Sequence, residues 1–243
     1  MMARALKLLS VPRRYSSYLR DWRQFEALVR DAGDDRFQLG WSDRVPALWE
    51  NSATTKFDAH YVYHTAWAVR MVTRMAPAKH IDISSTVYFC TTLSATVPVD
   101  FFDFRPAPIT LDGLYCGRED LTRLSFADNS IQSLSCMHTI EHVGLGRYGD
   151  PLDPAGDLKA CEELKRVVAP GGQLIIVVPV GKPRICFNAH RIYSHEQVLD
   201  MFSGFSVLET ALVRDNGEFV RNPLEAEFDA QSYGCGCFLF QKN

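Results

Sequence analysis

At 243 residues the chain is long enough for one large α/β domain or two small ones, and 47% hydrophobic against 23% charged residues is the balance of a globular protein with a buried core. A formal net charge of −3 lacks the basic excess that holds phosphates, so we expect no nucleic-acid partner. Seven cysteines with no C-x-x-C pair do not fit a zinc ribbon or a disulfide framework and favour reduced thiols in the cytoplasm. The apolar runs are too short for a membrane-spanning helix.

The N-terminal segment is basic and has a helical pattern. Residues 1–23 contain six basic side chains and one acidic one. A segment of this kind forms either a solvated lid or interaction arm, or a helix that lies on an anionic membrane. Apolar side chains three and four positions apart predict an amphipathic helix over residues 15–30. Residues 38–55 predict a loop with a short helix, whose two tryptophans either anchor the arm or cover a sugar ring. We therefore expect a helical extension or lid at residues 1–57.

A stronger helix is predicted over residues 58–76, with Asp58 as its cap and Pro77 as its stop. His60 and His64 lie one turn apart within it. Two histidines at that spacing suit a metal ion, but the sequence shows no third ligand at a matching distance. We interpret them as histidines on the polar face of the helix and expect no metal site.

From residue 79 onward, short strands and helices alternate along the chain. This alternation predicts an α/β domain, assigned to residues 58–243, with a mostly parallel sheet, helices on both faces and a ligand site at the carboxyl ends of the strands. The predicted strands cover residues 80–83, 97–104, 111–116, 133–137, 173–179, 205–213 and 234–241. The predicted helices cover residues 86–95, 157–168 and 194–202, and residues 217–231 form a loop or hairpin.

Acidic residues stand at the predicted ends of neighbouring strands. Asp82 ends one strand, and Asp103 ends the next, 21 residues later. In nucleoside-binding folds an acid about 20 residues beyond the first turn accepts hydrogen bonds from both ribose hydroxyls. Asp103 is therefore our candidate for a ribose contact. Asp120, which Leu121 follows, is placed to hold an adenine amino group.

The order of these segments is similar to that of class I S-adenosylmethionine-dependent methyltransferases. The segments are a strand with Asp82, a strand with Asp103, Asp120-Leu-Thr-Arg-Leu, Ser133-Leu-Ser-Cys-Met-His-Thr-Ile-Glu-His and Glu163-Leu-Lys-Arg-Val-Val-Ala-Pro-Gly-Gly. Residues 138–157 together with Phe187-Asn-Ala-His-Arg-Ile-Tyr resemble an uncharacterised family, domain of unknown function 268, whose members often occur with bacterial polysaccharide genes. The resemblance covers residues 57–213.

This resemblance implies a Rossmann-like methyltransferase fold with an N-terminal helical extension, and S-adenosylmethionine as cofactor. The residues that it implies for cofactor binding are Asp82, Ser84, Ser85, Asp103, Asp120 and Leu121. Methyltransferases carry an acid-x-Gly-x-Gly turn at the first strand end, because glycine lets the backbone approach the methionine part of the cofactor. Here the turn is Asp82-Ile-Ser-Ser-Thr. Either the serines replace the glycines, or the fold has been kept without the cofactor.

The segment His138-Thr-Ile-Glu141-His142 matches the H-x-x-E-H pattern of inverted zinc proteases. That pattern needs both histidines on one long helix, whereas here they follow a buried strand, so we expect no catalytic zinc. We predict instead that His142 and Glu141 handle the acceptor's proton, and that His138, the third residue of this candidate catalytic group, either joins them or lines the cofactor pocket. The alternative is that these histidines only bond loop carbonyls.

A glycine-rich loop after this segment and a second segment after residue 180 reach the same rim. The predicted acceptor-binding residues are Arg147, Tyr148, Asn188, His190, Arg191 and Tyr193. Their charges and hydroxyls suit a sugar, a glycan or a sugar nucleotide. Alternatives remain: Arg191 pairs with a loop acid, and Asp153 or Asp157 caps the next helix, the interpretation we favour for Asp157.

The resulting functional hypothesis is a cytoplasmic S-adenosylmethionine-dependent O-methyltransferase that acts on a sugar or glycan hydroxyl in polysaccharide biosynthesis. Residues 1–23 add the option of a peripheral membrane contact. The alternative hypothesis is a cofactor-free relative that binds a glycan or sugar nucleotide or does acid–base chemistry on it. The sequence does not predict an oligomeric state.

Overall fold

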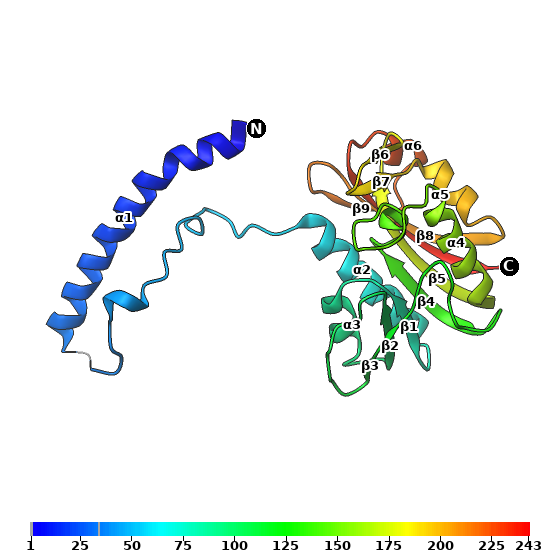
Figure 1. Ribbon diagram of the computed structural model, residues 1–243, viewed down its shortest axis with the longest axis horizontal. Coiled ribbons are helices and arrows are strands. Elements are labelled where there is room, and N and C mark those ends of the chain that lie inside the picture. The colour runs from blue at the N-terminus through cyan, green and yellow to red at the C-terminus, as the bar shows by residue number, and fades with distance from the viewer. Residues whose placement is uncertain (1, 34) are drawn as a thin grey trace. The chain divides into compact units, whose positions relative to one another are not determined.

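The computed structural model of the protein describes the backbone of residues 2–33 and 35–243 and the side chains of residues 11–33 and 35–243. The chain divides into two compact units, Met1–Phe57 and Asp58–Asn243 (Figure 1). No helix in the described part of the chain combines the length and the apolar character needed to cross a bilayer.

The N-terminal unit is one long helix with a segment folded back along it. Helix α1 (Met2–Ala32) is longer than the predicted one, and the short helix η1 is Trp41–Asp43. The ring of Trp41 packs edge-on against Trp22 of α1, with 5.8 Å between centroids, and the Arg14 guanidinium lies 4.7 Å from the centre of the Trp49 ring. Both tryptophans thus contact α1, which favours the anchoring role over a sugar-covering one.

The second unit is an α/β domain around one eight-stranded sheet with the order β3-β2-β1-β4-β5-β10-β8-β9. Its strands are β1 (His80–Ile83), β2 (Val99–Asp103), β3 (Leu114–Arg118), β4 (Ile131–Met137), β5 (Val168–Val180), β8 (Phe205–Val213), β9 (Phe219–Arg221) and β10 (Gly234–Lys242). The five neighbouring strands β3, β2, β1, β4 and β5 are parallel to one another. Strands β10, β8 and β9 extend the sheet from β5, and each of them pairs antiparallel with its neighbours. The predicted mostly parallel α/β domain is confirmed.

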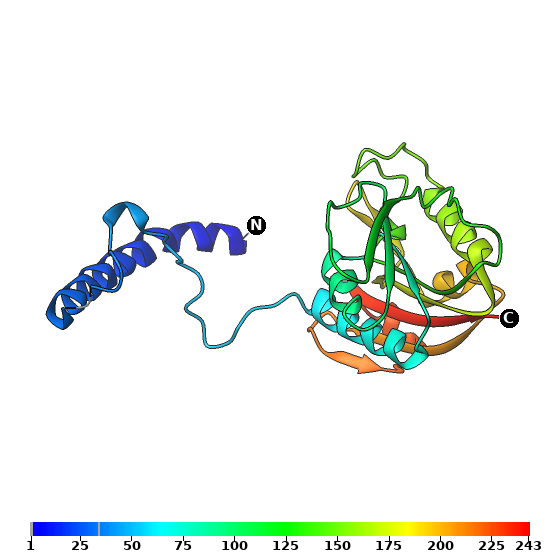
Figure 2. The same cartoon turned by 90° about the horizontal axis from the view of Figure 1, so that it is seen from below.

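Helices cover both faces of this sheet (Figure 2). The helices are α2 (Ala59–Met75), α3 (Val87–Leu93), α4 (Gly156–Val167), α5 (His195–Met201) and α6 (Glu225–Asp229). Trp67 of α2 and Phe89 of α3 pack with Val177, whereas Leu164 of α4 and Phe202 of α5 belong to the core cluster of the other face. Successive strand residues point to opposite faces, and because both faces are covered, β5 is apolar on both.

Capping residues fix two of the helices as the sequence predicts. Asp58 Oδ1 accepts the Tyr61 N–H at the start of α2, and Ala76 ends that helix in the left-handed conformation. Ser194 and Gln197 form a reciprocal capping box at α5. Each cap satisfies backbone groups that the first or last turn leaves without a partner.

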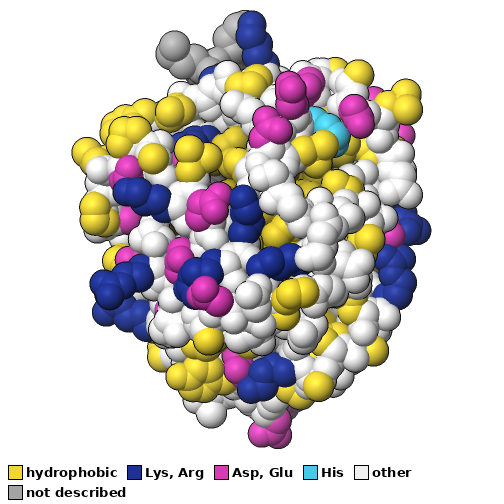
Figure 3. Space-filling model, turned by 90° about the vertical axis from the view of Figure 1, so that its right-hand side faces the viewer, with side chains coloured by type: hydrophobic (Ala, Val, Ile, Leu, Met, Phe, Trp, Pro, Cys, Tyr) yellow, Lys and Arg dark blue, Asp and Glu magenta, His cyan; other side chains and the backbone are white. Residues whose placement is uncertain are grey.

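The sequence misses several short elements. Strands β6 (Arg184–Cys186) and β7 (His190–Ile192) form a separate hairpin, and β9 and α6 occupy the region predicted as a loop or hairpin. Three-residue strands are too short to show a hydrophobic period. On the face of the molecule in Figure 3, basic and acidic side chains are interspersed, as a net charge of −3 leads one to expect.

Candidate active site

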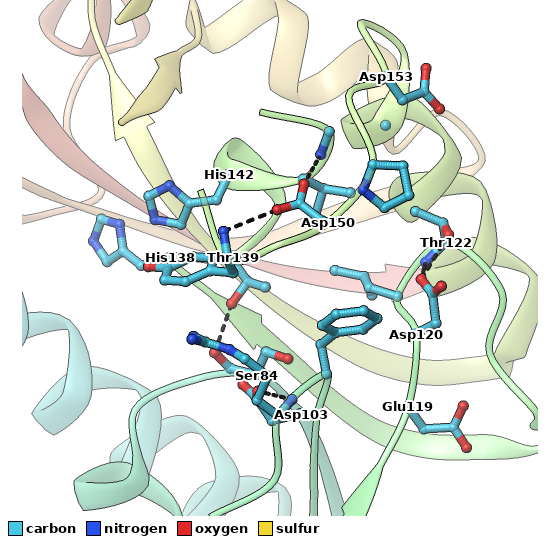
Figure 4. A pocket seen from close by; sticks show the side chains of 18 residues that line it. Ser84, Asp103, Glu119, Asp120, Thr122, His138, Thr139, His142, Asp150 and Asp153 are labelled. Atoms are coloured by element: carbon cyan, nitrogen blue, oxygen red, sulfur yellow. Dashed lines mark hydrogen bonds between the residues drawn. The ribbon is translucent and has the colours of Figure 1, made fainter. Parts of the chain in front are cut away.

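A cavity of about 290 Å³ opens at the carboxyl ends of β1, β2 and β4 (Figure 4). This is the edge of a parallel sheet at which α/β proteins bind ligands. Its lining residues are Ser84, Asp103, Phe104, Arg105, Glu119, Asp120, Leu121, Thr122, His138, Thr139, His142, Val143, Gly144, Tyr148, Asp150, Pro151, Asp153 and Gly156.

The turn after β1 keeps a glycine-like backbone although it contains no glycine. Ser84 lines the cavity with a φ of 58°, in the left-handed region that L residues other than Asn and Asp rarely enter. Its N–H donates to the carbonyl of Phe102 (2.7 Å), and its carbonyl accepts from Thr139 Oγ1 (2.8 Å). The turn is therefore tied to the ends of both neighbouring strands, β2 and β4.

Asp82 and Ser85 support this turn from behind and do not line the cavity. Asp82 is fully buried, and it accepts hydrogen bonds from the Ser85 N–H (3.0 Å) and from Ser135 Oγ. Burial raises the pKa of Asp82 to about 6, although these hydrogen bonds oppose the shift. Ser85 Oγ accepts the Met137 N–H at 3.1 Å. The prediction that these two side chains contact the cofactor is therefore wrong: they hold the turn.

Asp103, Asp120 and Leu121 all line the cavity, as predicted from their spacing. Asp103 Oδ1 accepts the Arg105 N–H at 2.7 Å. Asp120 Oδ1 accepts both the N–H (2.9 Å) and the hydroxyl (2.7 Å) of Thr122. An ionised carboxylate offers about four acceptor positions on two oxygens, so each of these acids keeps acceptor capacity for a ligand.

His138 and His142 line the cavity, and Glu141, which is buried and does not line it, connects them from behind. His138 Nδ1 lies 2.9 Å from Glu141 Oε1, and His142 Nε2 lies 3.7 Å from the same oxygen. Burial lowers the pKa of His138 to about 4 and raises that of Glu141 to about 7. His142 Nδ1 lies 2.5 Å from the carbonyl of Ala189, so this nitrogen carries a proton and Nε2 is the basic atom. Burial lowers the pKa of His142, against the opposing effect of Glu141.

The glycine-rich loop over the cavity is organised by Asp150, which the sequence marks as part of the polar face of the loop but not as the residue that holds its backbone. Its Oδ2 accepts the N–H groups of Gly144 (2.8 Å) and Gly146 (3.3 Å), and its Oδ1 accepts that of Tyr148 (3.1 Å). Burial raises the pKa of Asp150, but these backbone donors outweigh it and hold the pKa below its ordinary value. The guanidinium of Arg105 lies 4.6 Å from the centre of the Tyr148 ring and links this loop to the end of β2.

Of the six predicted acceptor residues, Tyr148 lines the cavity. Arg147 donates to the carbonyl of Ala189 at 2.9 Å. On either side of Ala189 in the chain, Asn188 is exposed and His190 is half-buried. The His190 ring lies 6.5 Å from that of His142, in an edge-on arrangement. Their role in acceptor binding stays a prediction.

Arg191 and Tyr193 are buried instead of facing the cavity. Arg191 donates to the carbonyl of Val143 (2.7 Å), and its Nε lies 3.4 Å from Asp157 Oδ2. The Tyr193 hydroxyl donates to the same oxygen at 3.0 Å. These two were predicted to bind the acceptor and Asp157 to cap α4; both predictions are wrong, since the three side chains satisfy one another. The alternative that Arg191 pairs with a nearby acid is the arrangement found, although that acid, Asp157, lies in the first turn of α4 and not in the loop.

Comparison with known proteins places this geometry. Residues 124–223 match the model of a family described as "Caenorhabditis protein of unknown function, DUF268". No curated protein matches the chain. The fold is similar to that of the N-methyltransferase NodS from Bradyrhizobium japonicum, solved with S-adenosyl-L-homocysteine, at 13% identity and a TM-score of 0.52, covering 89% of this chain and 97% of NodS.

Two further solved structures are similar. The YcgJ protein from Bacillus subtilis has 11% identity and a TM-score of 0.52, covering 75% of this chain and 99% of YcgJ. The cyclase SpnF has 14% identity and a TM-score of 0.50, covering 80% of this chain and 86% of SpnF. The chain therefore has the fold of the class I S-adenosylmethionine-dependent methyltransferases, and its residues 124–223 resemble the DUF268 family.

Proposed function

We propose that the protein is an S-adenosylmethionine-dependent methyltransferase that acts on a hydroxyl of a sugar or glycan. One observation carries the proposal: Ser84, Asp103 and Asp120, from the ends of three neighbouring strands, converge on one cavity. In a nucleoside pocket of this fold, these three positions serve the methionine part, the ribose and the adenine in that order.

The residues present fit the cofactor. The left-handed Ser84 preserves the backbone path that a glycine would take, so the chain still passes close to the cavity. Asp103 and Asp120 each retain free acceptor positions for hydroxyl and amino donors. At about 290 Å³, the cavity lies near the lower end of the roughly 300–1,000 Å³ typical of ligand pockets.

The acceptor side of the cavity supplies a base. S-adenosylmethionine, when bound, supplies an electrophilic methyl group. A sugar hydroxyl is a weak nucleophile, so a residue must take its proton as it attacks. His142 lines the cavity, and its Nδ1–H is held by the Ala189 carbonyl, which leaves Nε2 to accept that proton. Glu141 Oε1, 3.7 Å from Nε2, stabilises the imidazolium that results.

The choice of a sugar as acceptor is supported by the rim. Tyr148 brings an aromatic ring and a hydroxyl to the cavity, the Arg147 guanidinium lies 5.1 Å from the centre of that ring, and His190 packs edge-on against His142. Polyhydroxylated ligands bind to such mixed sets of aromatic and hydrogen-bonding side chains. A role in polysaccharide biosynthesis is part of this proposal and follows from the acceptor.

One observation favours a second candidate function, acid–base chemistry without the cofactor. Ser84 lines the cavity at a position where the methyltransferase turn has a glycine, which carries no side chain. The cyclase SpnF has a similar fold, so methyl transfer is not the sole activity that the fold carries.

Calorimetric titration with S-adenosylhomocysteine distinguishes methyl transfer from acid–base chemistry without the cofactor. We expect micromolar binding to the full chain and a loss of at least tenfold in Asp103→Ala, because a ribose hydrogen bond to a charged group contributes about 1.5–3 kcal/mol. Asp100→Ala is the matched control, since Asp100 lies on the same strand but pairs with Lys79. No binding at millimolar ligand would overturn the proposal in favour of the cofactor-free candidate.

The base is tested separately. Methyl transfer from labelled S-adenosylmethionine is followed with a panel of hexoses and nucleotide-linked hexoses. We expect His142→Ala to lower turnover by about 10²–10⁴-fold with little change in S-adenosylhomocysteine affinity, and added imidazole to restore part of the rate. A loss of cofactor affinity with unchanged turnover would instead place His142 in the cofactor site.

A further inference from the structure

A second group of metal-binding side chains lies next to the cavity. His60 comes from the first turn of α2, His138 follows β4, and Cys235 lies near the start of β10. One donor atom from each, two ring nitrogens and a sulfur, lie within 4.8 Å of one another. We propose that these three residues form a binding site for a zinc ion.

The His138 ring is held with the correct nitrogen facing the group. Its Nδ1 lies 2.9 Å from Glu141 Oε1 and its Nε2 lies 3.4 Å from Cys235 Sγ; in the tautomer whose Nδ1 donates to the Glu141 carboxylate, the Nε2 lone pair faces the sulfur. Histidines that bind metals commonly donate their other N–H to a carboxylate in this way. Nitrogen and sulfur ligands on a tetrahedral zinc ion are about 3.6 Å apart at the usual bond lengths, so this pair is already spaced for a shared ion.

His60 is positioned by a ring contact. Its ring stacks on that of Tyr233, two residues before Cys235, with 5.1 Å between the ring centroids. Its ring is nearly parallel to that of His138, at 9° and 6.0 Å between centroids. His64, one turn further along α2, does not compete for the ion, because its Nδ1 lies 2.6 Å from the His60 carbonyl and its Nε2 faces Thr65 Oγ1 at 3.4 Å.

Two independent features mark this corner as built for a ligand. Glu141 Oε2 is buried and has no hydrogen-bond partner among the residues that the structure describes, a state that proteins rarely leave uncompensated. His138 has a φ of 52°, a left-handed conformation that costs free energy and that carries its ring to the junction of α2 and β10.

The ligand set selects the ion. Two imidazoles and one thiolate suit zinc, whereas calcium and magnesium require oxygen ligands. Three protein ligands leave the fourth tetrahedral position to water or substrate, as in catalytic zinc sites. Since His138 also lines the cavity, the ion would stand at the cavity's edge, where it lowers the pKa of a bound water, hydroxyl or thiol. This site goes beyond the proposed methyl transfer and revises the expectation that the protein holds no metal.

The test uses the full chain, stripped of metal by a chelator and titrated with Zn²⁺ or Co²⁺ in the absence of S-adenosylmethionine. We expect one equivalent of metal per chain and, with Co²⁺, a thiolate-to-metal charge-transfer band. Cys235→Ser should abolish the band, whereas Cys186→Ser, which changes a thiol of the β6 hairpin, should leave it intact. Binding without a charge-transfer band, or a band that survives Cys235→Ser, would overturn the proposal.

Two further variants guard against loss by misfolding. His60 is half-buried in the first turn of α2, so His60→Ala should fold normally, as circular dichroism would show, and fail to bind stoichiometric metal. Glu141→Gln keeps all three ligands but replaces the carboxylate that orients His138 with a neutral amide, which is a weaker acceptor. We expect metal affinity to fall by about 10–100-fold. Metal affinity that is unchanged in both folded variants would contradict the site as proposed.

Discussion

At the scale of single residues, the backbone conformation of Ser84 bears on whether a turn without glycine can still bind S-adenosylmethionine. The absent glycine can be seen in the sequence, but the backbone conformation cannot, because serine usually has a negative φ. In the structure the turn has kept the left-handed conformation and only the side chain differs. The turn therefore has the backbone conformation that a glycine would adopt in the methyltransferase turn, although the residue is a serine.

Ser84→Gly should improve both stability and cofactor binding. Glycine relieves the cost of a left-handed L residue, about 1–2 kcal/mol, but adds freedom to the unfolded chain, so we expect a net gain of up to about 1 kcal/mol in the free energy of unfolding. Urea unfolding and S-adenosylhomocysteine calorimetry measure the two effects. Ser85→Gly is the control and should be destabilising, because it removes the hydroxyl that accepts the Met137 N–H. Equal effects of the two substitutions would mean that Ser84 carries no strain.

His80 should make the protein less stable in acid. It is buried between the hydroxyls of Ser133 (2.7 Å) and Ser135 (2.8 Å), and burial lowers its pKa from 6.5 to about 3. Between these two values the unfolded chain binds a proton that the folded protein excludes, so the stability from this group, complete above pH 6.5, falls by about 1.4 kcal/mol per unit as the pH drops.

The variant His80→Gln lacks this titration. It should be less stable than the wild type at pH 7, but the difference should narrow by about 2–3 kcal/mol between pH 6.5 and 4.5. Urea unfolding at several pH values measures it. Asp82, whose raised pKa gives the opposite slope, is present in both proteins and cancels to first order. Parallel pH curves for the two proteins would show that His80 does not stay neutral.

Residue-level prediction succeeds where a residue's position along a strand fixes its direction. Asp103 and Asp120 reach the cavity because the carboxyl ends of parallel strands meet there. The residues after β5 illustrate the limit. Arg191 lies in the hairpin strand β7, which is too short for its inner face to be deduced, Tyr193 follows that strand directly, and both side chains are buried. Cys235 is 97 residues from His138, so their contact requires the sheet order, which the sequence alone does not specify.

At the scale of elements, the long periodic segments are predictable and the loop over the cavity is not. Helix α2 and strand β5 carry clear apolar patterns and strong boundary residues. The loop of residues 143–153 has a fixed shape for another reason, the three backbone N–H groups that converge on Asp150. Side-chain acceptors of this kind leave no periodic pattern in the sequence.

Asp150→Ala should loosen this loop without unfolding the domain. Hydrogen exchange at the amides of Gly144, Gly146 and Tyr148 should become at least about tenfold faster, since charge-assisted hydrogen bonds stabilise by about 1.5–3 kcal/mol and this carboxylate is partly exposed. Asp153→Ala is the control, because the Asp153 carboxylate bonds Ala155 and Lys159 instead. Unchanged exchange at the three amides would mean that the glycines alone set the loop.

At the scale of the whole molecule, the buried core lies within the second unit, since no described side chain of residues 11–57 is buried. Both hydrophobic core clusters consist of residues from 58–243, and Arg14 and Trp22 find their partners within residues 1–57. A unit that contains its own core folds independently.

A chain of residues 58–243 should therefore fold alone. We expect its urea midpoint to match that of the α/β domain in the full chain, and its S-adenosylhomocysteine affinity to be unchanged. A markedly lower midpoint would show that residues 1–57 stabilise the domain.

Flotation with anionic vesicles tests whether the N-terminal helix binds membranes. If it does, the full chain floats with the vesicles and the chain of residues 58–243 does not. If residues 1–57 are a solvated arm, neither chain floats.

The place of β10 sets an order of assembly. It follows every other strand in the chain, yet it pairs with β5 on one side and β8 on the other, near the middle of the sheet. Until it leaves the ribosome, β5 and β8 present unpaired, apolar edges, the kind that recruit other chains. These edges stay unpaired from the synthesis of β5 until that of β10, and the insertion of β10 then completes the sheet in one step. Cys235 arrives with β10, so the proposed zinc site closes in the same step.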